Sequence, residues 1–429
     1  MRVSVEQNRS KLIFELELDD DDIAHLSSSK ISIGSTTATI DLEGLPLGEI
    51  HPDLIGLSAI LMCHPFTGNE LHLPMPVSLQ FLEGANDILS RYKIKSDSDS
   101  QLIPYKPPPR SRPGLAFSGG ADSIAALSVM PGNTVPVFMN RPMRGNSIYD
   151  SDAPLKNCEI LKEIGYDVKV IDCDLEYLRH PVGFPSDLAH AVPCILLSER
   201  LGLDSIAFGT ILESAYGIGH EHYIDYPNSS HCKFYGTLLS AAGLQLSLPV
   251  GGVSEVGTAM IIENSPLGEY SQSCIRGKKG KPCMRCWKCF RKESLSLALN
   301  ADKIVDLRSM MKNSSEIQIR LSDYPISHEN VVTFSMLNIN FRDYPYMRHL
   351  RNRLNTKLDL SLLRRWYSPS VVLMPERHRA TVMEKIMSFL APMSESQEEV
   401  IRTWDMSGFL ELDSTKKAHF DLTSSWQDL

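Results

Sequence analysis

The segment Leu115–Leu127 (LAFSGGADSIAAL) has the residue types of a phosphate-binding turn. A short apolar run ends at Phe117, and two adjacent glycines, Gly119 and Gly120, precede a stretch with helical character. Adjacent glycines let the backbone approach a ligand closely, and a helix N-terminus offers N–H groups with partial positive charge. The segment is therefore predicted to form a turn between a strand and a helix, and this turn is predicted to bind a phosphate chain.

Three side chains of this segment add chemistry to the backbone. Ser118 and Ser123 can donate hydroxyl hydrogen bonds to phosphate oxygens, and Asp122 can hold Mg²⁺ or cap the helix. A strand–turn–helix junction with a capping aspartate is the structural alternative. No GxxxxGK[ST] string occurs in the chain, so the turn is not a Walker loop.

A second pattern is the cysteine quartet Cys274, Cys283, Cys286 and Cys289, spaced C-x8-C-x2-C-x2-C. Four thiolates at such spacing can enclose one tetrahedral zinc ion, and a closed set leaves no open position for catalysis. We therefore expect a structural zinc lobe. An iron–sulfur cluster is the alternative, because its ligands are also four thiolates.

These residues need a scaffold, and the region from 114 to about 300 alternates short apolar runs with helical stretches such as Ala153–Ile164 and Leu188–Leu201. This alternation predicts an α/β domain with a parallel five-stranded sheet covered on both faces. The expected strands are Leu115–Phe117, Val135–Met139, Val168–Ile171, Ser205–Phe208 and Gln245–Leu248.

Ligands in such sheets lie beyond the carboxyl ends of the strands. Gly209 and Thr210 follow the fourth expected strand and are predicted to line the nucleotide crevice; Asn140 and Arg141 follow the second strand in the same way. The string 220–222 (HEH) lacks the spacing of a helical zinc pair and is interpreted as a loop cluster near the substrate.

Flanking regions are expected on both sides. Residues 1–104 are predicted to form a β-rich N-terminal recognition domain, with a strand over Lys30–Leu42 and apolar segments near Asp53–Met62 and Val77–Leu89. Residues 105–113 form a Pro-rich linker. Residues 301–429 are predicted to be mainly helical, for instance over Arg348–Trp366, and loose from about Asp413.

The bulk properties exclude some classes of protein. The 429 residues have 42% hydrophobic content and a formal net charge of -9, which disfavours nonspecific binding to nucleic acid. The chain starts without an apolar signal region and has no apolar run of membrane-spanning length, so a cytoplasmic location without membrane attachment is expected. Between Arg276 and Lys292 there are eight Lys or Arg residues and no acid, either a solvated ribbon or a rim that gathers anions.

The SGGADS string resembles the PP-loop of the N-type ATP pyrophosphatase superfamily. The cysteine quartet about 150 residues later makes the region from Gly114 to Ser296 similar to QueC, the 7-cyano-7-deazaguanine synthase family. Tyr226-Pro227-Asn228 stands where that family has Tyr-Pro-Asp, and Glu159-Ile160 match its Glu-Ile pair.

The resemblance implies ATP, Mg²⁺ and Zn²⁺ as cofactors, with Ser118 and Asp122 as catalytic residues. It implies an adenylate-forming ligase that converts a 7-deazaguanine carboxylate and ATP to an acyl adenylate and pyrophosphate. Ammonia or a partner protein's amine would then attack, the second case resembling QueC-like proteins of antiphage operons (the QatC type). A PP-loop enzyme acting on tRNA and a non-enzymatic nucleotide-binding scaffold are the alternatives.

The chain departs from the family pattern at three places. Gly183–Asp187 (GFPSD) replaces a Val-Pro-Gly-Arg-Asn loop, and Ser254-Glu255 has an anion where the family has a lysine. Asn140-Arg141-Pro142 replaces an aromatic-Gly-Gln-Arg stretch. These changes and the added flanking regions indicate a substrate pair, or a second step, that differs from that of QueC.

Overall fold

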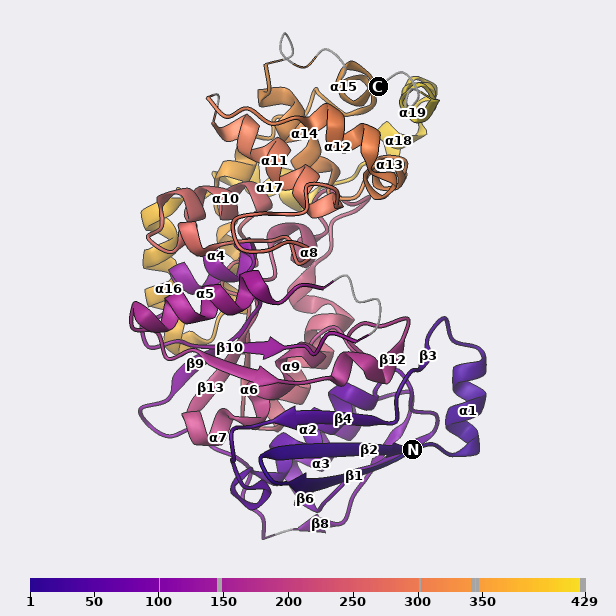
Figure 1. Ribbon diagram of the computed structural model, residues 1–429, viewed down its shortest axis with the longest axis vertical. Helices are drawn as coiled ribbons and strands as arrows, with labels where there is room; N and C mark the ends of the chain where they lie inside the picture. Colours follow the sequence, from indigo (N-terminus) through magenta and orange to yellow (C-terminus); the bar gives the residue numbers. More distant parts are fainter. Residues whose placement is uncertain (100, 145–148, 301, 341–343, 345–346, 425–429) are drawn as a thin grey trace.

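The computed structural model describes residues 1–99, 101–144, 149–300, 302–340, 344 and 347–424. Three regions follow one another along its long axis (Figure 1). An N-terminal unit lies at one end, a parallel sheet with its helices lies in the middle, and a mostly helical region lies at the other end.

The middle region contains the predicted parallel sheet, with strand order β11-β10-β9-β13-β14 and parallel pairing throughout. All five predicted strands are present, with ends shifted by at most three residues. The chain leaves β9 toward β10 on one side and later returns to β13 on the other, so the strand order reverses between β9 and β13. The strands are β9 (Arg112–Phe117), β10 (Val135–Asn140), β11 (Lys169–Asp172), β13 (Leu203–Ala207) and β14 (Gln245–Ser247).

Alternating side chains of these strands pack on two separate apolar clusters. Leu115 and Phe117 join a cluster with α4, α5, α10 and α16, whereas Ala116 joins one with α6 and α9. This follows from the two-residue period of a strand. The helices are α4 (Ala121–Val129), α5 (Asp152–Glu163), α6 (Val192–Leu196), α9 (Ser230–Ala241), α10 (Glu255–Asn264) and α16 (Glu376–Phe389).

The predicted helix Ala153–Ile164 is confirmed as α5, but Leu188–Leu201 is not one helix. It forms a 3-10 turn followed by α6 and α7 (Ser198–Leu201). Pro193 lies in the first turn of α6, where its missing N–H is tolerated, so a new helix begins there.

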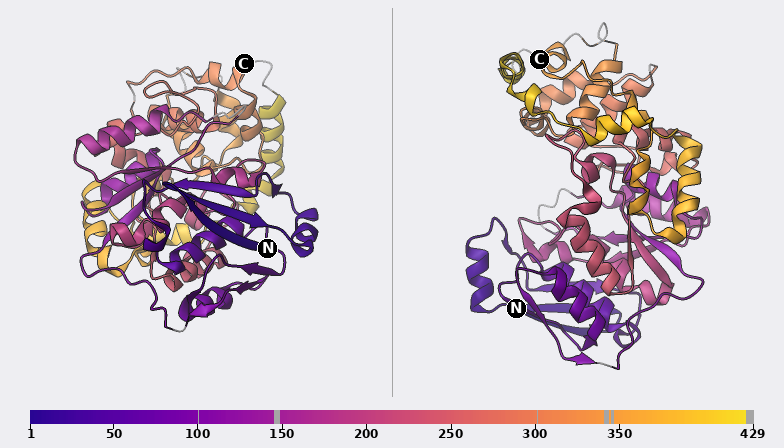
Figure 2. Two further views of the ribbon diagram at one scale, coloured as in Figure 1. Left: turned by 60° about the horizontal axis from the view of Figure 1, so that its bottom comes forward. Right: turned by 180° about the vertical axis from the view of Figure 1, so that it is seen from behind.

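One face of the sheet is completed by residues from far along the chain. Trp366, Val382 and Ile386 are buried in the same cluster as Leu115 and Phe117. Figures 1 and 2 show α16 lying beside α4. Helix α4 follows the turn at residues 118–123, called the phosphate turn below because the sequence predicts that it binds phosphate. This helix is therefore supported by a segment about 250 residues later in the chain.

The N-terminal unit is a mixed sheet with helices, of strand order β4-β2-β1-β5-β7. The expected strand Lys30–Leu42 is divided into β3 and β4, which belong to different sheets. The strands are β1 (Arg2–Asn8), β2 (Lys11–Glu17), β3 (Ser32–Ile33), β4 (Thr37–Asp41), β5 (Glu70–His72), β6 (Val77–Ser78), β7 (Lys93–Lys95), β8 (Ser98–Asp99) and β12 (Arg179–His180), which pairs with β3.

Helices α2 (Pro52–Cys63) and α3 (Leu79–Ile88) occupy the two apolar segments noted in the sequence, and α1 spans Asp20–Ser27. Nearly all of α2 is buried, because it packs on strand β6 and on α6 of the middle region. One continuous apolar cluster runs from the N-terminal strands to one face of the parallel sheet.

The third region is helical, as predicted, and surrounds a separate apolar cluster that contains three of the four clustered cysteines. Two details of the prediction are wrong. Arg348–Trp366 is helical only over α15, with a 3-10 turn after it, and Asp413–Ser424 is a helix because it buries Leu422 against this cluster. The last five residues lie outside the described ranges.

Helix α8 (Leu212–Tyr216) belongs to the middle region. The helices of the third region are α11 (Trp287–Leu299), α12 (Leu307–Asn313), α13 (Ser315–Leu321), α14 (Glu329–Asn338), α15 (Arg348–Arg353), α17 (Glu395–Arg402), α18 (Ser407–Glu411) and α19 (Asp413–Ser424). Among the residues that the structure describes, none of the helices combines the length and the apolar character needed to cross a bilayer.

Candidate active site and metal centre

The glycine-rich turn lies between the end of β9 and the start of α4, as the sequence predicts. Gly119 has φ +71°, a conformation that glycine adopts without strain, and a Cβ there would approach Pro154 to 3.2 Å. The Ser118 hydroxyl donates to the Ser123 hydroxyl (3.1 Å), which donates to the carbonyl of Gly120 (3.0 Å). The turn is thus folded by its own hydroxyl groups.

The N-terminus of α4 faces the site and has no capping side chain of its own. Its N-cap is Gly120, and among the described residues no side chain of the cap position accepts a hydrogen bond from the first turn. The N–H of Ala121 instead donates to the hydroxyl of Ser273 (3.1 Å), a residue next to the cysteine quartet. Such a helix end is suited to an anion.

Gly209 and Thr210 lie across from this turn, directly after β13. A Cβ on Gly209 would lie 2.9 Å from the backbone carbon of Asp122 and from the backbone nitrogen of Ser123. Only a glycine therefore lets the loop after β13 pack on the first turn of α4. The two loops follow the strands between which the sheet order reverses, where ligands bind in open α/β sheets.

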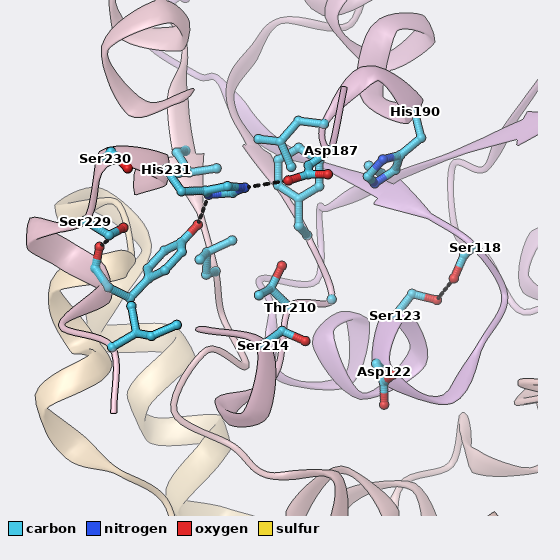
Figure 3. Close-up of a pocket in the computed structure, with 18 residues that line it drawn as sticks. Ser118, Asp122, Ser123, Asp187, His190, Thr210, Ser214, Ser229, Ser230 and His231 are labelled. Atoms are coloured by element: carbon cyan, nitrogen blue, oxygen red, sulfur yellow. Dashed lines mark hydrogen bonds and ion pairs between the residues drawn. The ribbon is translucent and has the colours of Figure 1, made fainter. Parts of the chain in front are cut away.

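A cavity of about 690 Å³ opens at this place, within the usual size of a ligand pocket. Five of the predicted site residues line it: Ser118, Asp122, Ser123, Gly209 and Thr210. Figure 3 shows the phosphate turn on one side of the cavity, with Thr210 and Ser214 between it and a second polar group.

That second group consists of Asp187, His231 and Tyr226. His231 Nε2 lies 3.1 Å from Asp187 Oδ2, and its Nδ1 lies 3.0 Å from the Tyr226 hydroxyl (Figure 3). The hydrogen bond from His231 holds the pKa of Asp187 below its usual value. His231 was not predicted as a site residue; the polar run before α9, capped by Ser229, is the only signal for it in the sequence.

The carboxylate of Asp122 also contacts a residue that the sequence did not single out. Lys292 Nζ lies 3.4 Å from Asp122 Oδ1 and 3.1 Å from Glu255 Oε1, and the Thr258 hydroxyl donates to Asp122 Oδ1 (3.3 Å). Burial alone would lower the pKa of Lys292, but Asp122 and Glu255 outweigh it and raise that pKa.

Glu255, the anion that departs from the QueC pattern, is fully buried and paired. Arg291 lies 3.1 Å from its second oxygen, and although burial would raise its pKa, Lys292 and Arg291 lower it. The backbone N–H of Glu255 donates to the carboxyl group of Glu213, whose pKa is raised to about 7 by burial and by Glu255. The amide of Asn330 also donates to Glu213.

The four cysteines of the quartet converge, with all sulfur atoms within 4.8 Å of one another. The Cys286 and Cys289 sulfurs are 3.5 Å apart and those of Cys283 and Cys289 are 3.9 Å apart. Zinc–sulfur bonds of about 2.3 Å in a tetrahedron separate the sulfurs by roughly 3.8 Å. The cluster therefore fits one metal ion such as zinc.

Other sequence-predicted residues are not brought to the cavity. Asn140 donates to Asp172 (2.6 Å) and Arg141 pairs with Glu176 (3.0 Å), because both turn toward the end of β11. His220, Glu221 and His222 are absent from the described lining; the His222 Nδ1 lies 3.4 Å from Asp405. The interpretation of 220–222 as a loop cluster near the substrate stays a prediction, and Ile224, two residues further along the chain, does line the cavity.

The basic stretch from Arg276 to Lys292 is not simply a solvated ribbon. Arg276 pairs with Glu316, the ammonium group of Lys279 donates to Asn157 (2.6 Å), and Arg291 and Lys292 pair with Glu255. Four of its eight basic residues thus attach the cysteine lobe to its surroundings.

Residues 234–405 match a family of unknown function (DUF6395). The matched range begins within α9 and includes Glu255, Lys292 and the cysteine quartet, but it starts after the phosphate turn. Neither the curated proteins nor the solved structures include a match to the chain.

Proposed function

We propose that this protein is an ATP-dependent, adenylate-forming ligase of the PP-loop type. The observation that carries the proposal is the N-terminus of α4, which has glycine at its N-cap and opens at the strand-order reversal of a parallel sheet beside a cavity of about 690 Å³. Backbone N–H groups and the hydroxyls of Ser118 and Ser123 suit a triphosphate there.

The proposed first step activates a carboxylate. A carboxylate oxygen attacks the α-phosphorus of ATP, the bond to the β-phosphate oxygen breaks, and pyrophosphate leaves with the electron pair. The product is an acyl adenylate, whose carbonyl carbon accepts an amine because AMP is a far better leaving group than oxide. The amine nitrogen then bonds to that carbon, AMP leaves, and one proton is released.

Asp122 and Lys292 are suited to opposite parts of the nucleotide complex. Asp122 is partly exposed and offers a carboxylate to Mg²⁺, which would supply charge neutralisation of the phosphates when bound. Lys292, held at Glu255, offers an ammonium group to the phosphate oxygens. The ion pair between the two would be exchanged for these ligand contacts.

The proposed carboxylate is a 7-deazaguanine carboxylate, on the resemblance to QueC, and the cavity volume is compatible with a nucleotide and a small heterocycle together. The acceptor is ammonia or the amine of a partner protein, as in the antiphage setting. Such a reaction belongs in the cytoplasm, where ATP and Mg²⁺ are available.

Sulfur transfer to tRNA is the less favoured alternative. It needs a reactive thiol outside the metal centre, yet Cys63, Cys158, Cys173 and Cys194 are buried, and burial raises the pKa of each thiol. Cys232 is half-buried, has a raised pKa and does not line the described cavity. A pure binding scaffold would explain the phosphate turn but not the second polar group.

Exchange of labelled pyrophosphate into ATP tests the proposal, with 7-carboxy-7-deazaguanine as the carboxylate. We expect carboxylate-dependent exchange by the wild-type protein and a loss of at least about 100-fold in Asp122→Ala, since electrostatic groups at such sites contribute on this scale. ATP binding without exchange in the wild type would indicate the scaffold, and equal exchange in both proteins would reject the role of the phosphate turn.

A further inference from the structure

The end of the cavity opposite the phosphate turn holds a hydrogen-bonded chain of three groups, Asp187, His231 and Tyr226 (Figure 3). An adenylation step needs none of them, because a carboxylate attacks without losing a proton. The second step does need a base, since the attacking amine must lose a proton. The following inference rests on the proposed ligase activity and assigns a role in it to these three hydrogen-bonded groups.

The imidazole ring is fixed from several sides. Asp187 is an acceptor at one nitrogen, the Tyr226 hydroxyl lies at the other, and the Tyr235 ring lies 4.7 Å from the His231 ring. The Tyr235 hydroxyl in turn accepts from the backbone N–H of Asp187 (3.1 Å). A ring held this way is oriented by the fold before any ligand binds.

The partners also define where the free electron pair lies. An ionised carboxylate can only accept, so the neutral ring assigns its proton to Nε2, which donates to Asp187. Nδ1 then carries the lone pair and accepts from the Tyr226 hydroxyl. The Tyr226 oxygen retains electron pairs that can accept a further hydrogen bond from a ligand.

We infer that His231, oriented by Asp187, is the general base of the acceptor step and takes the proton of the attacking amine through the hydroxyl of Tyr226. The amine nitrogen bonds to the acyl carbon, and the carbon–oxygen bond to AMP breaks with its electron pair on AMP. The amine proton passes to the Tyr226 oxygen while the hydroxyl proton passes to Nδ1. His231 ends as the imidazolium beside Asp187, which stabilises its charge.

The other polar groups of the cavity are less suited to this role. His190 also lines the cavity, but burial lowers its pKa to about 4, so it is a weak base at neutral pH. Asp122 lies on the phosphate side and is paired with Lys292.

The location of these three hydrogen-bonded groups also indicates the class of acceptor. The side chain of Asp187 is 77% exposed and that of His231 is 38% exposed, so this end of the cavity is open to solvent. An exposed carboxylate attracts a cationic amine, either an ammonium ion or a lysine side chain, which loses one proton to water before the neutral amine attacks. A lysine of another protein can reach such an open end.

Three amine acceptors allow the role of the general base to be tested separately from the activation of the carboxylate. Hydroxylamine is uncharged at neutral pH and traps acyl adenylates without a base, whereas ammonium chloride and Nα-acetyl-lysine are mostly protonated. With 7-carboxy-7-deazaguanine as substrate, we expect His231→Gln to lower amide formation by about 100-fold or more while pyrophosphate exchange and hydroxamate formation stay within about threefold of wild type. Tyr226→Phe should behave in the same way.

His222→Gln is the matched control, because it makes the same change at an exposed histidine outside the cavity lining. The inference is overturned if His231→Gln lowers exchange, hydroxamate and amide together, or changes none of them. It is also overturned if the wild type forms hydroxamate but transfers to neither amine. Absence of exchange in the wild type would instead reject the proposed function. Comparison of amide formation with ammonium chloride and with Nα-acetyl-lysine shows whether the natural acceptor is free ammonia or a protein lysine.

Discussion

Lys292 and Asp122 are 170 positions apart in the chain, yet the Lys292 ammonium group lies 3.4 Å from the Asp122 carboxylate. Lys292 belongs to α11, whose N-terminus carries two of the four cysteines: Cys286 is the N-cap, and its sulfur accepts from the backbone N–H of Cys289 (3.4 Å). The cysteine cluster and the turn at residues 118–123 are therefore joined through one helix and one ion pair.

Substitution of Lys292 should affect ATP binding before it affects folding. We expect Lys292→Gln to weaken ATP binding about tenfold, equivalent to about 1.4 kcal/mol, because one phosphate-facing cation is lost. Lys292→Arg should retain most of the affinity, and thermal unfolding would check that both variants are folded. Unchanged ATP affinity in folded Lys292→Gln would show that this cation does not face the phosphates.

Removal of the metal should weaken the connection between the cysteine cluster and the phosphate turn. We expect metal analysis of the purified protein to find one zinc per chain, and Cys286→Ser to lower both the melting temperature and ATP affinity. Metal binding by four thiolates contributes on the order of 10 kcal/mol in small peptides, so the effect on stability should be large. Cys232→Ser is the control, since Cys232 lies outside the quartet. Iron in place of zinc would contradict the assignment.

Gly209 offers a test of the close approach of two loops. A Cβ at this position would meet the first turn of α4 at 2.9 Å, and backbone atoms there cannot move without displacing Asp122. We expect Gly209→Ala to reduce pyrophosphate exchange by about tenfold or more, as small displacements at active sites often do. Gly236→Ala, in helix α9 with open space around it, should leave exchange unchanged and slightly raise stability.

The buried carboxyl group of Glu213 predicts a pH dependence of stability. Its pKa is about 7 in the folded protein against an ordinary 4.5, so the folded state retains a proton that the unfolded chain has released between these values. The free energy of unfolding should therefore fall as pH rises from 4.5 to 7, by up to about 3 kcal/mol from this group.

Glu213→Gln should remove that decline, since a glutamine keeps the acceptor for Glu255 and Asn330 without the charge. Denaturant unfolding at several pH values between 5 and 8 measures the difference. A variant whose stability still falls with pH as steeply as the wild type would show that another group titrates in this range.

Several elements were predictable because their signals are local. The five strands are short apolar runs, the turn at Gly119 needs a left-handed residue, and Cys283, Cys286 and Cys289 are close enough in sequence to share one ion. Each of these features depends on neighbours within a few positions, which a pattern can capture.

The contacts that complete the site are not local. Lys292 was one of eight basic residues in a stretch, and nothing in the sequence distinguishes it from Lys288 until the fold pairs it with Glu255 of α10. Asp187 and His231 meet only because the segment before α6 packs on helix α9, where the Tyr235 hydroxyl accepts from the backbone N–H of Asp187. Trp366 belongs to the C-terminal region in sequence but is buried in the core of the parallel sheet. This contact too depends on tertiary packing, which a local sequence pattern does not show.

The edge of the parallel sheet at β11 is covered by the N-terminal unit. Ile40 of β4 bridges Cys173 in antiparallel fashion, and the backbone N–H of Thr39 donates to Asp174 (2.6 Å). An unprotected edge strand is a template for pairing with another molecule. A shortened protein that lacks the first hundred residues would expose this edge and would therefore be expected to self-associate, even if it kept the cavity and the cysteine cluster.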